Sequence, residues 1–99
     1  MIIRLVSLTI HPDHLDDFVE LFKNAEDMIR NSPGCLHLEL LQDTGDQNTL
    51  LTYSHWKDEA ALDRYRGSDF FRTTWGKAKK FFNDKPKAMS LTKYHSGKN

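Results

Sequence analysis

Aromatic side chains are concentrated between Leu50 and Trp75, in the stretch LLTYSHWKDEAALDRYRGSDFFRTTW. Within it, Trp56, Tyr65 and Trp75 carry the groups best suited to ligand chemistry. An indole offers a large flat face and one N–H donor, and a phenol offers a hydroxyl that donates or accepts a hydrogen bond. Side chains of these types either fill a core or line a pocket that holds a flat, apolar molecule.

Two sets of residues are candidates for such a pocket. Trp56 stands where a predicted strand meets a helix, so it either plugs the edge of the core or forms a pocket wall. Tyr65 either packs at a rim or bonds the phenolate oxygen of a ligand. The candidate catalytic residues are Trp56, Tyr65, His37 and His55. The candidate pocket-lining residues are Phe22, Thr52, Ser54, Phe71 and Trp75.

Two small polar residues beside Trp56 favour the pocket. Successive side chains of a strand point to opposite faces, so Thr52, Ser54 and Trp56 share one face. A face that mixes two hydroxyls with a large ring is too polar for a tight core and too apolar for solvent. It suits a small cavity with a few fixed polar groups, closed by the helix that carries Phe71 and Trp75.

The two candidate histidines lie on neighbouring predicted strands, and they share a face in only one parity of the strand register. In CLHLELLQ, alternation puts Leu36, Leu38 and Leu40 toward the core and Cys35, His37 and Glu39 on the other side. A histidine can act as a base near neutral pH, or it can be an exposed or hydrogen-bonded strand residue. Two histidines without a third ligand are weak evidence for a metal.

The bulk composition narrows the possible partners. A chain of 99 residues makes one domain, and 14 basic residues balance 14 acidic ones. Zero net charge argues against nucleic-acid or anionic-membrane partners, because both select a positive field. The single cysteine, Cys35, fits a reducing compartment, and MIIRLVSLTI resembles a strand more than a signal peptide. We therefore expect a cytoplasmic protein.

Hydrophobic periodicity and breaker residues predict the order of the elements. A helix is indicated by apolar residues at Leu15, Phe18, Phe22 and Ile29, and it ends at NSPG. Asp58 and Ser68 are placed to cap two further helices. The predicted elements are a strand at 2–10, a helix to residue 30, strands at 35–42 and 49–56, helices at 59–66 and from 68, and a strand at 87–95.

This order predicts an α+β fold of the ferredoxin-like split βαβ type, in which an antiparallel four-stranded sheet carries its helices on one face. The other face still holds Leu41, Leu51 and Tyr53, and such a face is too apolar to be left exposed to water. A second copy of the chain is the simplest cover, so we expect a homodimer. Residues 1–95 form the predicted domain, and residues 96–99 form a flexible C-terminal tail.

Three motifs, in this order, resemble the antibiotic biosynthesis monooxygenase (ABM) family of dimeric α+β barrels. They are SPGCLHLELLQD, NTLLTYSHWKDEAAL and GSDFF, and the resemblance covers nearly the whole chain. The family implies two subunits packed sheet against sheet. Its members include cofactor-independent oxygenases of polyphenols and quinols, haem-degrading monooxygenases and proteins of unknown activity. A shared fold does not by itself fix the function.

The chain departs from two branches of that family at identifiable positions. Haem-degrading members combine an Asn on the first strand, a Trp that ends the third strand and a His on the long second-half helix. Here the Trp is present as Trp56, but the Asn position falls at Val6 or Ser7 and the His position at Trp75. Without that His there is no evident axial ligand for haem iron, and we expect no haem degradation.

The quinol-oxygenase-like pattern H-x-x-S-x-H-F appears as YRGSDFF, with Tyr65 and Phe70 in the histidine places. Cofactor-free oxygenation needs only an apolar pocket, a proton acceptor and donors for developing charge. Motifs for nucleotides, flavins or metals are absent from the sequence, so we predict no cofactor and no metal. We therefore expect a small monooxygenase that uses O₂ on a quinol, polyphenol or similar aromatic substrate. The alternative is a non-catalytic dimeric ligand-binding or stress-related module.

Overall fold

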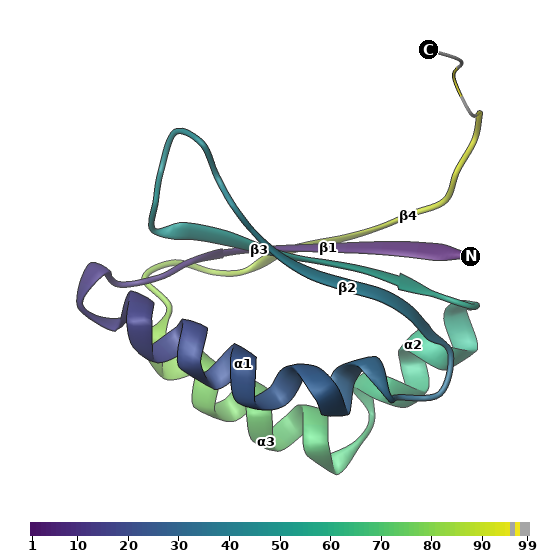
Figure 1. Ribbon diagram of the computed structural model, residues 1–99, viewed down its shortest axis with the longest axis horizontal. Coiled ribbons are helices and arrows are strands. Elements are labelled where there is room, and N and C mark those ends of the chain that lie inside the picture. The colour runs from purple at the N-terminus through teal and green to yellow at the C-terminus, as the bar shows by residue number, and fades with distance from the viewer. Residues whose placement is uncertain (96, 98–99) are drawn as a thin grey trace.

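The computed structural model describes residues 1–95 and 97, and its centre is one antiparallel sheet in the order β2-β3-β1-β4. The strands are β1 (Ile2–Thr9), β2 (Cys35–Gln42), β3 (Thr49–Trp56) and β4 (Lys87–Leu91). All the helices lie under one face of this sheet (Figure 1). The predicted α+β fold is therefore confirmed. Of the predicted tail, residues 96, 98 and 99 lie outside the described residues.

Helix α1 (Leu15–Arg30) follows a separate 3-10 turn at Pro12–His14, and it buries Phe18, Ala25 and Ile29 against the sheet. The chain then turns through Gly34, whose φ of +86° favours glycine. Glycine is needed there for a second reason, since a Cβ would lie 2.4 Å from the Cβ of Ala61. This close approach lets α2 pack directly against the turn that follows α1.

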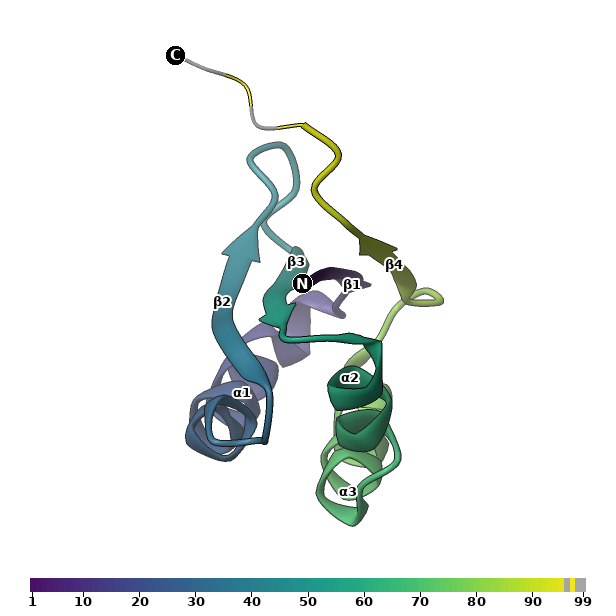
Figure 2. The same ribbon diagram turned by 90° about the vertical axis from the view of Figure 1, so that its right-hand side faces the viewer.

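Helices α2 (Glu59–Arg66) and α3 (Asp69–Ala78) begin at the predicted caps. The Asp58 carboxylate accepts a hydrogen bond from the backbone N–H of Ala61 at 2.8 Å, and the Ser68 hydroxyl accepts one from that of Phe71 at 3.1 Å. Each bond satisfies a backbone donor that the first helical turn leaves free. Figure 2 shows α1 beneath β2, and α2 with α3 on the other side of the same layer.

Two strand predictions require correction. β2 contains a bulge between Cys35 and His37, and this irregularity gives Leu36 no partner in the register with β3. Leu36 is consequently 59% exposed, whereas Cys35 packs against the core, the reverse of the predicted alternation. β4 ends at Leu91 and not at His95.

The two faces of the sheet differ in what covers them. We call the face toward the helices the helix-side face, and it carries buried Leu8, Leu38, Leu50 and Trp56. We call the other face the open face, because the described residues place no helix over it (Figure 1). Strand register puts the following residues on the open face: Ile3, Leu5, Ser7, His37, Glu39, Leu41, Leu51, Tyr53, His55, Met89 and Leu91.

A candidate ligand pocket between the sheet and its helices

A cavity of about 320 Å³ lies between the helix-side face and the three helices. Its size falls at the lower end of the range for small-molecule sites. The lining is mostly apolar, and it includes all five residues predicted to line a pocket: Phe22, Thr52, Ser54, Phe71 and Trp75. Trp56 and Tyr65, two of the four candidate catalytic residues, also border it.

Four aromatic rings run in sequence along one side of the cavity, and we call them the aromatic row: Trp56, Tyr65, Phe71 and Trp75. Trp56 stacks on Tyr65 with ring centroids 4.9 Å apart, and Tyr65 meets Phe71 edge to face at 5.1 Å. Phe71 stacks on Trp75 at 5.7 Å with an interplanar angle of 11°. Because α2 and α3 supply three of the rings, the caps at Asp58 and Ser68 position most of the row.

Trp56 serves both the core and the pocket. It is 1% exposed, and its indole N–H donates to the Ser54 hydroxyl at 3.0 Å. The indole N–H, which the sequence analysis assigned as a possible donor to a ligand, is therefore already engaged. Trp56 therefore contributes a fixed ring face to the pocket, whereas Trp75 is only partly buried.

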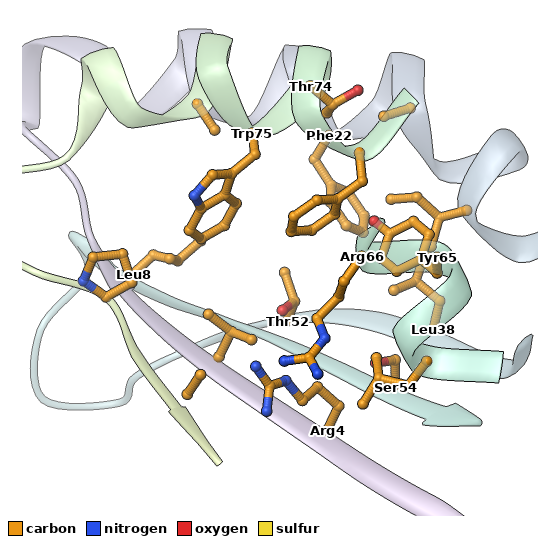
Figure 3. Close-up of a pocket in the computed structure, with 18 of the residues that line it drawn as sticks. Arg4, Leu8, Phe22, Leu38, Thr52, Ser54, Tyr65, Arg66, Thr74 and Trp75 are labelled. Atoms are coloured by element: carbon orange, nitrogen blue, oxygen red, sulfur yellow. The ribbon is translucent and has the colours of Figure 1, made fainter. Parts of the chain in front are cut away.

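Tyr65 keeps its proton over the whole physiological range. Burial raises the pKa of its phenol to about 12, with a smaller contribution from the Cys35 thiol. Figure 3 shows its ring beside Phe22 and above Arg66. A neutral phenol at this position is a hydrogen-bond donor and not a base.

Arg4 and Arg66 are the charged residues among the cavity-lining residues that the sequence analysis did not predict. Arg4 comes from β1 and Arg66 from the last turn of α2, and both line the cavity. In Figure 3 the two guanidinium groups point toward one another near Thr52 and Ser54. The sequence held one indication of this pair, namely Arg4 within an apolar strand. Charged residues are rarely buried without a partner, so an arginine on the core face of a strand indicates a functional or pairing role.

His37 and His55 lie on the open face, on the side of the sheet away from the cavity. They are direct cross-strand partners with ring centroids 5.1 Å apart, which settles the open question of register parity. His55 and the Tyr53 hydroxyl share a hydrogen bond of 2.7 Å, and His37 pairs with Glu39. Strand alternation therefore places these two candidate catalytic histidines on the opposite side of the sheet from Trp56.

The side chains present do not fit a metal or haem iron. No group of three or more histidine, cysteine or acidic residues within residues 1–95 and 97 could hold a metal ion. The described residues that line the cavity include no histidine, cysteine or methionine, and the one tyrosine among them, Tyr65, keeps its phenol proton. Burial also raises the pKa of the Cys35 thiol, which keeps it protonated and unreactive.

Among the described residues, no helix has both the length and the apolar character that a membrane span requires.

Comparisons with known proteins agree on the family. The sequence profile described as antibiotic biosynthesis monooxygenase matches residues 1–76. An isomerase of (4S)-4-hydroxy-5-phosphonooxypentane-2,3-dione from Escherichia coli is 27% identical over 77 residues, which are 78% of this chain and 80% of that enzyme. The fold therefore carries monooxygenases and isomerases.

Two further likenesses are to a longer protein and to a solved structure. A protein of Natronomonas pharaonis whose name refers to heme binding is 30% identical over 83 residues. The match covers 84% of this chain but only 14% of that much longer protein. The crystal structure of a mutant of SnoaB, a cofactor-independent oxygenase from Streptomyces nogalater, is 16% identical with a TM-score of 0.85. It covers 96% of this chain and 94% of that one, and at this identity the likeness shows the fold alone.

Proposed function

The chain belongs to the antibiotic biosynthesis monooxygenase family, and from that premise we propose that it is a cofactor-independent monooxygenase of a planar, ionisable aromatic compound of the quinol, polyphenol or anthrone type. The aromatic row is the observation that carries this proposal. Its rings border a cavity of about 320 Å³ whose lining is mostly apolar. Flat ring faces and an apolar cavity select a flat, conjugated molecule.

The chemistry asks the protein to bind and to exclude water. With an anthrone, the substrate loses a proton and its carbanion gives electrons to O₂. The ring CH₂ becomes C=O, one oxygen atom enters the product, and the other leaves as water with the two hydrogens. Four electrons pass from the carbon to O₂, so no further reductant is needed. The apolar lining excludes water from this step, and Tyr65, as a neutral phenol, donates a hydrogen bond to developing negative charge.

Oxygen uptake tests this function. The purified protein is mixed with dithranol, a hydroxyanthrone, in air-saturated buffer with catalase, and O₂ and the quinone product are followed together. We expect a rate that is proportional to protein concentration, with one O₂ consumed per quinone formed. The matched control is Phe70→Leu beside Phe71→Leu, because Phe71 lines the cavity and Phe70 packs against the core outside it. A rate equal to the protein-free autoxidation would overturn the proposal.

The second candidate function is a non-catalytic ligand-binding module of the same fold. It is favoured by one observation, namely that the described residues lining the cavity include no carboxylate and no imidazole to accept a proton. In the monooxygenase the substrate must then lose its proton to solvent as it binds, before the step with O₂ from which water is excluded. The dithranol experiment separates the two functions. If the protein is a binding module, dithranol quenches its tryptophan fluorescence, but the rate of O₂ consumption stays equal to the protein-free rate.

We also propose that the protein is a cytoplasmic homodimer. Proteins of this family commonly form dimers. The open face of this chain supports the same assembly, because Leu41, Met89 and Leu91 are exposed on it. A second open face of the same kind is the partner that covers them, and a stable interface of this type buries about 2,000 Å² or more in total. Cytoplasmic residence is supported by the single, unpaired Cys35.

A further inference from the structure

Two arginines from distant parts of the chain converge on one wall of the cavity. Arg4 lies on β1 and Arg66 at the end of α2, and Figure 3 shows their guanidinium groups facing each other. Each has one contact that holds it in place. Arg4 donates to the Ser90 hydroxyl at 2.9 Å, and Arg66 pairs with the Asp63 carboxylate at 2.7 Å. These contacts position the two groups but use only part of their donors, since each guanidinium has five N–H bonds.

Charge is unbalanced at this wall. Burial, and after it the positive charge of Arg66, lower the pKa of Arg4, which still remains protonated at neutral pH. Among the ion pairs of residues 1–95 and 97 none involves Arg4. Asp63 offsets part of the charge on Arg66, but both groups are substantially exposed, where water and salt screen the pair. A partly buried cation without a counterion is unfavourable, so an anion placed between the two arginines relieves both.

The shape of the cavity indicates what else that anion carries. The mostly apolar remainder of the lining continues from the arginines to the aromatic row, and Thr52 and Ser54 lie beside them (Figure 3). A small inorganic anion would leave these ring faces without a partner. A ligand with an oxyanion at one end and a conjugated ring body fills both parts.

We propose that Arg4 and Arg66 form an anion subsite that holds the ionised oxygen of a planar aromatic ligand, while its ring lies along the aromatic row. The aromatic class of this ligand rests on the function proposed above. A phenolate is the favoured anion, because the pair then also promotes ionisation of the substrate in a cavity whose lining supplies no carboxylate or imidazole among the described residues. A positive charge within about 4–6 Å shifts the ionisation of an acid by about 1–3 pKa units.

The experiment measures ionisation of a bound probe under argon, so that no turnover is needed. The probe is 2-naphthol, whose phenolate band is titrated with and without saturating protein. We expect the apparent pKa of the bound naphthol to fall by at least about one unit, a tenfold change in its ionisation constant. Arg4→Gln and Arg66→Gln should each remove most of the shift, and Arg4→Lys should keep part of it because the charge remains.

The matched control is Arg72→Gln. Arg72 also pairs with an acid three residues before it, Asp69, but it is exposed on α3 and does not line the cavity. It should leave the naphthol shift unchanged. Melting curves establish that each variant is folded, and Arg4→Lys preserves the test if Arg4→Gln unfolds.

Further arms identify the anion. 2-Naphthoate competing equally well would extend the subsite to carboxylates, whereas 2-methoxynaphthalene should bind at least about tenfold more weakly than naphtholate. Inorganic phosphate that binds and displaces naphtholate at lower concentration would overturn the aromatic class in favour of a phosphorylated ligand.

Two results separate this subsite from the function. Naphthol that binds with an unshifted pKa, or that fails to bind, would overturn the subsite even if dithranol is oxidised. A shifted pKa with no dithranol oxidation would leave the subsite standing and overturn the monooxygenase.

Discussion

The two faces of strand β3 carry different chemistry within one run of eight residues. Toward the helices the strand presents Thr52, Ser54 and Trp56, which border the enclosed cavity. Toward the open face it presents Leu51, Tyr53 and His55. The two faces differ in their cover, because helices of the same chain lie over one face and none of the described residues forms a helix over the other (Figure 2).

This difference indicates which interactions each face can support. The Trp56 to Ser54 hydrogen bond is buried, and the low dielectric around it strengthens it. On the open face of a single chain, water competes for the His37, His55 and Tyr53 cluster. The helix-side face is thus suited to a small ligand, and the open face to association with another protein surface. The predictions below test this division.

The largest effect is expected from a charge on the open face. Met89 on β4 is 54% exposed and Met28 on α1 is 57% exposed, so each tolerates a glutamate in the isolated chain. Met89→Glu should weaken the homodimer by about 100-fold or more, because a buried, unpaired charge costs several kcal/mol. Met28→Glu should leave it unchanged. Sedimentation velocity across micromolar concentrations measures both, and equal sedimentation of the two variants would contradict an interface at the open face.

The two tryptophans should separate stability from binding. Trp56→Phe removes buried ring volume and the donor that the Ser54 hydroxyl accepts, so we expect a loss of about 2–3 kcal/mol in the free energy of unfolding. Trp75→Phe, at a partly buried position, should cost about 1 kcal/mol or less. Trp75→Phe should reduce the free energy of naphtholate binding by more than it reduces the free energy of unfolding. Urea unfolding and the probe titration are measured on both variants. If Trp75→Phe lowers the free energy of unfolding but leaves naphtholate binding unchanged, Trp75 serves the core alone.

Sequence patterns predicted the elements better than the site. Alternation and periodicity are local properties, so β3, α1 and the caps at Asp58 and Ser68 were predicted correctly. The β2 bulge was missed because it leaves no breaker residue between Cys35 and His37, and it reverses the faces of Cys35 and Leu36.

The arginine pair was missed for a different reason. Arg66 falls at the end of the helix predicted at 59–66, and Arg4 falls within the apolar strand predicted at 2–10. The meeting of the two arginines depends on how α2 docks against the sheet, to which the close approach of Gly34 and Ala61 contributes. No local pattern contains that information. The same holds for His37 and His55, whose common face followed from the register and not from their types.

Alkaline pH should destabilise the protein through Tyr65. Its pKa is raised from 10.0 to about 12 in the folded state, so the folded chain holds this proton more tightly than the unfolded chain does. The stabilisation is complete below pH 10, and it is lost as the pH rises from 10 through 12, by about 3 kcal/mol in total. Tyr65→Phe should remove this part of the slope. The measurement is urea unfolding at intervals of half a pH unit, and identical slopes for both proteins would contradict it.

The last comparison is of one hydrogen bond on each face, and the shorter of the two bonds should contribute less to stability. The bond from Trp56 to Ser54 is 3.0 Å and buried, and the bond between His55 and Tyr53 is shorter, at 2.7 Å, and only partly buried. Ser54→Ala leaves a buried donor without a partner, which costs about 1–3 kcal/mol, whereas water replaces a lost partner on an exposed surface. Tyr53→Phe should therefore cost less than about 1 kcal/mol when it is made in the Met89→Glu background, where the open face is wet. In the dimer the same change should cost more, because the partner excludes that water. If Tyr53→Phe lowers the free energy of unfolding equally in the two backgrounds, the second copy does not cover the His37, Tyr53 and His55 cluster. This conclusion holds whether or not Met89→Glu changes the sedimentation.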